Sequence, residues 1–579
     1  MIQTKIDGII DIVRTSEGKL ITFKEIAERF GSDVLEIEQI ARIFEKNFVF
    51  ETVYPLNPFE HPGIDAVKEL PKVIEPEIPE GNVIEKYEIN AENGHISGNV
   101  FILEVPGERG KIYFLKKQKV SNYTKIYLNY LQDKVALELP PETMQMTDEE
   151  QKKGVYKRQC ELTEKYLSKI EKDPINIRLM CGMIRSVMFG LGEMDSLLCD
   201  DWLEEIGVNR AKTPILVYHR KYGWLKTNLF MENNDQILNY SAQIARRVGK
   251  QISTLNPILD AHLVTGDRVN ATMPPISHTG NTLTIRRFAR NPWTLGHMIS
   301  KKMGNINPEM AALLWQAIHY EMSILVAGGT ASGKTSILNA LAMFIPPYQR
   351  IVSIEDTREI MLPSMHWNWI PMVTRLPNPE GLGGVNMLDL MINALRMRPD
   401  RIIVGEIRKS DEARVLFEAM QTGHSVYSTL HADTGLQVVR RLIEPPIEVP
   451  PSELEAVDLV LVQYRDRRSN LRRTSEISEI ISSAGVPDIS KSYLWRARND
   501  TFELIKPPNK YVQSINLHTG MTEKEIYEDQ KRKATILVWL DKHDFINLEQ
   551  IGNAIKFYYS DEASLYKAAE QDVGPESVF

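Results

Sequence analysis

The apolar positions of the first fifty residues recur at helical spacing. Between residues 37 and 44 they fall at intervals of 0, +3, +4 and +7, which is the pattern of one helix face. Thr22 and Glu25 predict a capping box at the start of another helix, which comes before this one in the sequence. The β-branched and aromatic run FVFETVYP predicts a strand after the two helices. These signals together predict a winged-helix-like helical module over residues 1–54.

The helix that would serve as the recognition helix of this module is acidic. A surface of that sign is poorly suited to phosphates, so we expect the module to dock protein or to have a structural role. Its charged side chains are Asp33, Glu36, Glu38 and Glu45 against Arg42 and Lys46.

A proline-rich stretch and a predicted hairpin follow the module. Six prolines between residues 55 and 80 predict an extended linker over 55–82. The alternating runs NVFILEV and KIYFLKKQKV on either side of PGERG predict two paired strands. A helical stretch comes next, so we expect residues 83–170 to form a small β-containing module with a connecting helix.

The rest of the chain divides into three predicted parts. Helices alternate with strands such as TPILVYHR over residues 171–290, which predicts an α+β domain. Strand and helix patterns alternate regularly over 291–505, which is typical of an α/β domain with a parallel-rich sheet. Thr522 and Glu525 predict another capping box in a helical carboxyl-terminal extension, 506–579.

Composition and charge narrow the class of protein. The chain of 579 residues is 43% hydrophobic with a net charge of −8, which predicts a globular protein and argues against direct contact with nucleic acid. Its three cysteines, Cys160, Cys181 and Cys199, are odd in number and widely spaced, so we expect reduced thiols and a cytosolic protein. The acidic residues among the apolar ones at the amino terminus, and the charges that interrupt every apolar run, lead us to expect neither a signal peptide nor a membrane-spanning segment.

The segment ILVAGGTASGKTSILNALAMF carries the clearest chemistry. It fits the phosphate-binding pattern G-x-x-x-x-G-K-[ST], and its flanks predict the strand before and the helix after that this pattern requires. Lys334 would neutralise phosphate charge and the Thr335 hydroxyl would reach Mg²⁺. The expected ATP-binding residues are Gly328, Gly329, Thr330, Ala331, Ser332, Gly333, Lys334, Thr335 and Ser336.

Three further apolar runs each end in a polar group. Glu355 follows IVSI, Glu406 follows RIIV, and His431 follows SVYST. If these runs are parallel strands beside the phosphate-binding strand, their carboxyl ends open onto one crevice. We therefore expect two carboxylates and an imidazole around the γ-phosphate.

The two glutamates are assigned different tasks. Glu406 is expected to bind Mg²⁺ or its water, and Glu355 to orient or deprotonate the attacking water, although the two roles could be exchanged. Asp356 and Glu359 are expected to form supporting ion pairs. The residues alone do not decide whether His431 senses the γ-phosphate or is structural, because a histidine at a strand end is often a hydrogen-bonded structural residue. The same two interpretations apply to His424.

The four segments GGTASGKTS, IEDTREI, VGEIR and STLHAD resemble a known family. In this order they are similar to the Walker A, aspartate box, Walker B and histidine box of the ATPases that power type II secretion, type IV pilus assembly and the archaeal flagellum. GDRVNATMPP and LTIRRFARNPWTL resemble parts of the preceding domain in the archaeal branch. The resemblance covers about residues 170–480 and implies a RecA-like domain in a ring hexamer.

The resemblance also bears on the arginines of the preceding domain. From the residues alone, Arg268, Arg286 and Arg287 would be surface ion-pair residues. The family places arginines of this domain near the phosphates, from the same or the neighbouring subunit, which implies a catalytic role for Arg268 and Arg286. Arg290 lies close by in the sequence. The resemblance likewise favours His431 as the histidine of the histidine box.

The implied function is ATP hydrolysis, with Mg²⁺, that drives assembly or secretion of a pilin-like filament. A homohexamer in the cytoplasm would sit at the inner face of the membrane through a polytopic platform protein and would act on filament subunits indirectly. A conjugation or DNA-uptake ATPase and a filament-retraction motor remain alternatives. One departure from many bacterial members is that no cysteine follows Cys199, so we do not expect a four-cysteine zinc module.

Overall fold

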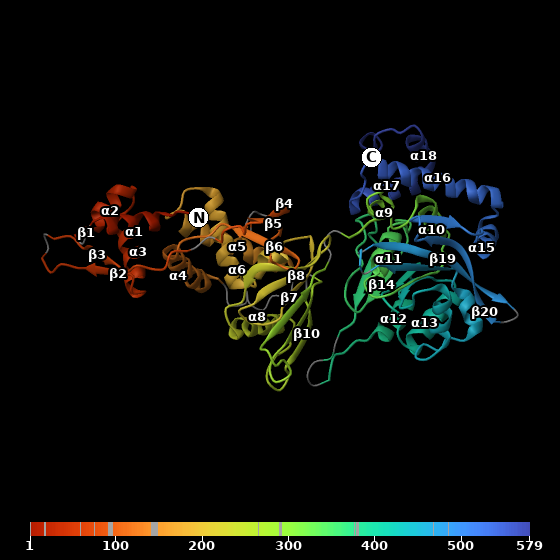
Figure 1. The fold of residues 1–579 in the computed structure, drawn as a ribbon, viewed down its shortest axis with the longest axis horizontal. Coiled ribbons are helices and arrows are strands. Elements are labelled where there is room, and N and C mark those ends of the chain that lie inside the picture. The colour runs from red at the N-terminus through yellow and green to blue at the C-terminus, as the bar shows by residue number, and fades with distance from the viewer. Residues whose placement is uncertain are drawn as a thin grey trace. The chain divides into compact units, whose positions relative to one another are not determined.

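The computed structural model describes most of the chain in two compact units, Met1–Arg287 and Phe288–Phe579 (Figure 1). The described residues are 2–16, 19–57, 60–73, 76–90, 97–139, 149–263, 266–288, 292–375, 377, 381–466, 468–469, 471–483 and 486–579. Among these residues, no helix combines the length and apolar character needed to cross a bilayer.

Three helices and a small antiparallel sheet begin the first unit. The elements are α1 (Lys5–Thr15), α2 (Phe23–Phe30), α3 (Val34–Lys46), β1 (Ile21–Thr22), β2 (Phe50–Val53) and β3 (Gly63–Val67), and the strand order is β1-β3-β2. The predicted capping box of α2 is present. The Thr22 N–H donates to Glu25 Oε2 at 2.9 Å, and the Glu25 N–H donates to Thr22 Oγ1 at 3.2 Å.

Strand β3 lies inside the segment predicted as an extended linker over 55–82. Ile64 is fully buried in the core of the three helices. A Cβ on Gly63 would lie 2.2 Å from the Ile21 carbonyl oxygen, so glycine permits the close approach of the two strands. The linker prediction is therefore wrong for residues 63–67, because proline spacing says nothing about pairing with a distant strand.

The helices that follow share the core of the amino-terminal elements. These helices are α4 (Asn122–Glu138), α5 (Glu149–Leu167) and α6 (Pro174–Phe189). Tyr127, Leu131 and Met180 are buried in one cluster with Ile6 and Phe44. The core of the first 54 residues therefore continues into these later helices.

A nine-stranded sheet forms the rest of the first unit. Its order is β10-β11-β12-β7-β8-β9-β6-β5-β4, and it includes the predicted hairpin as β5 and β6. Because β6 pairs with β9, the segments predicted as 83–170 and 171–290 contribute to one sheet. The elements are β4 (Asn82–Asn90), β5 (Ser97–Glu104), β6 (Lys111–Lys117), α7 (Met194–Leu198), β7 (Leu203–Val208), β8 (Pro214–His219), β9 (Gly223–Phe230), α8 (Asn234–Arg247), β10 (Ile258–His262), β11 (Arg268–Thr272) and β12 (Thr282–Arg286).

The second unit is built on another nine-stranded sheet, of order β15-β14-β16-β17-β13-β18-β19-β20-β21. The six strands from β15 to β18 are parallel and the last three are antiparallel, so the prediction of a parallel-rich α/β domain is confirmed. The strands are β13 (Ile324–Gly328), β14 (Ile351–Glu355), β15 (Trp369–Val373), β16 (Arg401–Val404), β17 (Ser425–Leu430), β18 (Leu459–Arg465), β19 (Arg472–Ser483), β20 (Val486–Arg496) and β21 (Thr501–Leu504).

Helices cover both faces of this sheet (Figure 1). Alternate residues of β13 enter different cores: Ile324 and Val326 face one, and Leu325 and Ala327 face the other. Such alternation with both faces buried explains the continuous apolar run of this strand. The helices before and between the strands are α9 (Leu295–Ile299), α10 (Pro308–His319), α11 (Lys334–Ala342), α12 (Met387–Leu395), α13 (Ser410–Gln421) and α14 (Gly435–Ile443).

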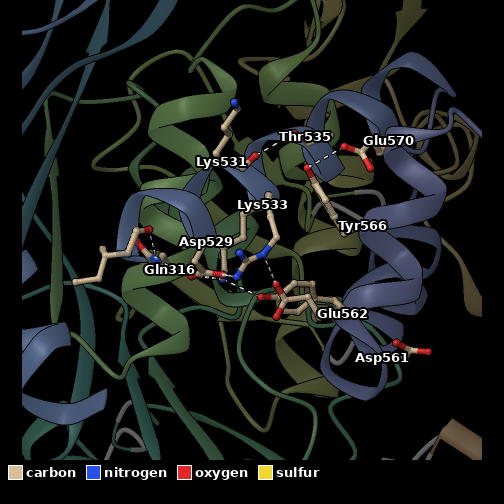
Figure 2. Close-up of polar contacts among 12 residues, drawn as sticks. Gln316, Asp529, Lys531, Lys533, Thr535, Asp561, Glu562, Tyr566 and Glu570 are labelled. Carbon is tan, nitrogen blue, oxygen red and sulfur yellow. Dashed lines mark hydrogen bonds and ion pairs between the residues drawn. The ribbon is translucent and has the colours of Figure 1, made fainter. Parts of the chain in front are cut away.

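The carboxyl-terminal helices belong to the second unit. They are α15 (Asn509–Thr519), α16 (Glu523–Lys542), α17 (Leu548–Ser560) and α18 (Glu562–Glu570). Figure 2 shows the polar network that joins them to α10: Lys533 Nζ lies 2.6 Å from both carboxylate oxygens of Asp529, and Gln316 donates to the same carboxylate. Residues 506–579 therefore share a core with the sheet domain.

Candidate active site

The phosphate-binding loop connects β13 to α11 with the backbone that its glycines permit. Gly328, Ala331 and Gly333 have φ values of 154°, 59° and 95°. A Cβ on Gly328 would lie 2.5 Å from the Gln463 carbonyl oxygen of the neighbouring strand β18, so that position requires glycine. The turn therefore delivers Lys334 to the first residue of a helix.

Lys334 folds back under the loop. Its Nζ donates to the carbonyl oxygens of Gly328 and Gly329 at 2.9 Å and 3.0 Å. Burial lowers the pKa of Lys334, and the charges of Glu406 and Asp433 oppose that shift. A buried cation that hydrogen-bonds to neutral carbonyl oxygens is well placed to bind a phosphate.

The helix that follows presents the other phosphate-binding groups. Gly333 precedes α11 and makes no side-chain cap, so the N–H groups of the first turn are left for another acceptor. Thr335 and Ser336 lie in that turn and are partly buried. Oxygen donors of this kind suit Mg²⁺ when phosphates complete its coordination.

Glu355 is a buried carboxylate at the end of β14. Its Oε1 accepts the N–H groups of Glu359 and Ile360 at 2.9 Å and 3.0 Å. Its Oε2 is buried and has no hydrogen-bond partner among the described residues. Burial raises the pKa of Glu355 to about 7, which leaves the free oxygen able to accept or hold a proton near neutral pH.

Glu406 and His431 meet beyond the ends of β16 and β17. Glu406 Oε1 lies 3.6 Å from His431 Nε2. Burial and the nearby Lys334 lower the pKa of His431, so the imidazole is neutral at pH 7. His424 lies before β17, at the opposite end of the strand from His431, and hydrogen-bonds locally with the Ala419 carbonyl oxygen.

Parallel pairing brings these groups to one edge of the sheet. The strands β13, β17, β16 and β14 pair in parallel in that spatial order, and Lys334, Glu355, Glu406 and His431 each follow or end one of them. The expectation that these side chains share one edge agrees with this topology.

The arginines predicted from the preceding domain lie in the first unit. Arg268 and Arg286 stand directly opposite each other on β11 and β12, and Arg286 stands opposite Glu205 on the next strand. Arg268 forms two hydrogen bonds to Asp260, at 3.3 Å and 3.0 Å. Each of the two arginines therefore has an acidic residue opposite it or bonded to it on a neighbouring strand.

Arg287 has a different place from its neighbour. Its side chain is 4% exposed and pairs with Asp201 at 3.5 Å, and its guanidinium also donates to the Leu203 carbonyl oxygen at 3.2 Å. Arg286 is exposed. Of the two adjacent arginines, only Arg286 is therefore available to a ligand, while Arg290 lies outside the described residues.

Two arginines near the loop were missed in the sequence. Arg408 lies in the quoted segment VGEIR and binds both Glu406 and Asp356. Arg472 Nε donates to the Ala331 carbonyl oxygen at 3.2 Å. The basic run RDRRSNLRR, which contains Arg472, could have pointed to this residue in the sequence. A small net charge of the whole chain can conceal such a local basic segment.

Known proteins match the part of the chain that carries this site. Residues 232–539 match the model of the family described as Type II/IV secretion system protein. An uncharacterized protein of Methanocaldococcus jannaschii is 35% identical over 386 residues, which cover 65% of this chain and 69% of that protein.

Two further matches come from bacteria. The type IV secretion system protein PtlH of Bordetella pertussis is 31% identical over 319 residues, which cover 50% of this chain and 93% of PtlH. The structure of the VirB11 ATPase of the Brucella suis type IV secretion system matches 49% of this chain and 92% of that chain at 24% identity, with a TM-score of 0.25. Because the family model spans more than half of the sequence and includes the phosphate-binding loop, the chain belongs to the type II/IV secretion system protein family and is an ATPase of that family.

Proposed function

We propose that this ATPase uses Mg²⁺-dependent ATP hydrolysis to drive assembly or secretion of a pilin-like filament. The observation that carries the hydrolytic part is the common edge of β13, β14, β16 and β17, where a phosphate-binding lysine, two carboxylates and a histidine follow parallel strands. Hydrolysis of a phosphoanhydride needs positioned phosphates, positive charge and an oriented water, and these groups can supply each of them.

The loop would bind the nucleotide through its backbone and Lys334. The N–H groups at the start of α11 would receive phosphate oxygens, and Lys334 would exchange the carbonyl oxygens of Gly328 and Gly329 for β- and γ-phosphate oxygens. Thr335 and Glu406 would hold Mg²⁺ directly or through water. When bound, the ion would neutralise charge on the transferring phosphoryl group.

Glu355 would act on the attacking water. Its buried Oε2 is unpaired among the described residues, and its raised pKa of about 7 suits a group that accepts a proton near neutral pH. Glu406 remains the alternative for this task. His431, within 3.6 Å of Glu406, would report the state of the γ-phosphate.

The arginines of the first unit would complete the site during closure. Arg268 and Arg286 form an opposed pair on neighbouring strands, which supports a shared role in binding phosphate oxygens. They would act within one chain or across a subunit boundary of a homohexamer. Movement of the first unit against the second, as ATP binds and is hydrolysed, would then be the mechanical step.

The work would be done at the inner face of the cell membrane. A cytoplasmic hexamer would act on filament subunits through a polytopic membrane platform protein and would not contact nucleic acid directly. Membership of the type II/IV family supports coupling to membrane machinery. The similarity to a protein described as a type IV secretion component keeps a conjugation or DNA-uptake system as the second candidate.

ATPase assays of four variants test the site. Lys334→Ala, Glu355→Gln, Glu406→Gln and Arg286→Ala should each hydrolyse ATP more slowly than the wild type while eluting like it in gel filtration. Normal hydrolysis by both glutamine variants would refute the assignment of the active site. Strong stimulation by single-stranded DNA would instead favour the second candidate.

Mixed oligomers test whether the arginine acts between subunits. Arg286→Ala carries an intact loop, and Lys334→Ala carries an intact arginine. If Arg286 acts in trans, mixing the two variants should restore part of the activity. No recovery in a mixture shown to contain mixed oligomers would contradict a trans role. Co-purification with a membrane protein encoded nearby tests the platform.

A further inference from the structure

Arg408 joins the ends of two neighbouring strands in the candidate site. Its Nε and Nη2 donate to Glu406 Oε2 at 2.9 Å and 2.7 Å, and its Nη1 donates to Asp356 Oδ2. Glu406 follows β16 and Asp356 follows β14, and those strands pair in parallel. One guanidinium therefore binds two carboxylates that leave the sheet at the same edge.

The remaining oxygens of the two carboxylates are oriented by other groups. Glu406 Oε1 faces His431 Nε2 at 3.6 Å. Asp356 Oδ1 accepts the Thr374 hydroxyl at 3.3 Å. Arg408 thus occupies one oxygen of Glu406 and leaves the other pointing toward the histidine.

The backbone that carries Arg408 is also held in place. The N–H groups of Arg408 and Lys409 both lie 3.2 Å from Glu412 Oε2, and Glu412 is only 9% exposed. This carboxylate caps the start of α13. The backbone of Arg408 is therefore held in place, whereas its side chain is 56% exposed, so its ion pairs contribute little to the stability of the fold.

We infer that Arg408 is a positioning residue for ATP hydrolysis. It holds Glu406 with Oε1 toward His431 and separates the negative charges of Glu406 and Asp356. Without it, the two carboxylates would repel each other at adjacent strand ends and Glu406 would lose its defined orientation. This inference rests on the proposed catalytic role of Glu406, and it explains why an arginine stands two residues after that glutamate.

Steady-state kinetics of Arg408→Gln and Arg408→Lys test the inference on the full chain. Groups that orient a catalytic carboxylate typically change activity by about 10- to 100-fold. We expect Arg408→Gln to lower kcat by that factor while KM for MgATP changes by less than about threefold, because the loop N–H groups and Lys334, and not Arg408, bind the phosphates. Arg408→Lys should recover part of kcat, since an ammonium can still bind one carboxylate.

A double variant separates positioning from general stability. If Arg408 acts through Glu406, adding Arg408→Gln to Glu406→Gln should lower kcat no further. Arg414→Gln is the matched control, because Arg414 is exposed on α13, the helix that follows Arg408, and it should retain wild-type kinetics. Thermal unfolding and binding of a fluorescent ATP analogue should be unchanged in Arg408→Gln.

Two results would overturn the inference. One is normal kcat in Arg408→Gln while Glu406→Gln is inactive, which would leave the proposed function intact. The other is an equal further loss when the two substitutions are combined, which would indicate an independent effect. Normal hydrolysis by Glu406→Gln itself would refute the assigned site and the inference together, so the two failures are distinguishable.

Discussion

Replacement of Glu355 by glutamine should remove a pH-dependent cost to folding. The carboxyl group is 2% exposed, and burial raises its pKa from 4.5 to about 7. Below pH 4.5 the group is protonated in both the folded and the unfolded protein. As pH rises, it ionises first in the unfolded chain, so the free energy of unfolding falls until the folded group also ionises near pH 7.

The size of this effect follows from the shift. One pKa unit corresponds to about 1.4 kcal/mol, so the change from 4.5 to about 7 makes the nucleotide-free protein ~3 kcal/mol less stable above pH 7 than below pH 4.5. Glutamine cannot ionise and retains an Oε1 that accepts the N–H groups of Glu359 and Ile360. The stability of Glu355→Gln relative to the wild type should therefore increase with pH.

Thermal unfolding at pH 5 and pH 8 measures the difference. For a unit of this size about 1 kcal/mol corresponds to ~2–4 °C, so the Tm of Glu355→Gln relative to wild type should rise by about 5 °C or more between the two pH values. Glu418→Gln, at an exposed position of α13, should show no such change. A pH-independent difference between Glu355→Gln and wild type would refute the reasoning.

The pH dependence of wild-type activity should reflect the ionisation of Glu355 as well. If Glu355 is the base, it must be ionised to accept a proton, so kcat/KM should rise as pH increases through about 7. The Glu355→Gln variant should lose this acidic limb together with most of its activity. A residual activity that keeps the wild-type limb would assign the base to another group.

Variants at three other places in the protein give further tests. Lys334→Ala should weaken binding of a fluorescent ATP analogue by at least about tenfold, because a charge-assisted contact to phosphate is lost; unchanged affinity would contradict the phosphate-binding role. Arg287→Ala should lower Tm while Arg286→Ala should not, because only the side chain of Arg287 is buried, at 4% exposure. Lys533→Met should destabilise the protein by up to about 3–5 kcal/mol, because buried Asp529 loses the ammonium that contacts both its oxygens and keeps Arg532 as its remaining ion-pair partner; Asp529→Leu in addition should recover part of the loss in Tm.

Local patterns predicted most of the individual elements. The capping boxes at Thr22 and Thr522 could be recognised in the sequence because each one joins residues three positions apart. Both form in the structure. The phosphate-binding loop at Gly328 could also be recognised, because its turn requires glycines at positions only a few residues apart. Strand β3 could not be recognised in this way, because Ile21, with which Ile64 pairs, is distant in the chain.

The division into domains was harder to predict for the same reason. The α16 and α17 helices were expected, but the burial of α16 against α10 includes a contact of Asp529 with Gln316, more than two hundred residues away. Nothing in the spacing of a single helix specifies which distant face will cover it. Polar residues at helical positions read as solvent-facing until the partner helix is known.

The sequence by itself determined the chemistry of the candidate site, because a phosphate-binding turn and apolar strands ending in Glu355, Glu406 and His431 are short-range patterns. Only the tertiary structure decided how those groups are engaged. It left one oxygen of Glu355 unpaired among the described residues, buried Arg287 beside exposed Arg286, and brought Arg408 between two carboxylates. Burial and ion pairing depend on which elements, distant in the sequence, pack against each other, and a local sequence pattern does not specify those contacts.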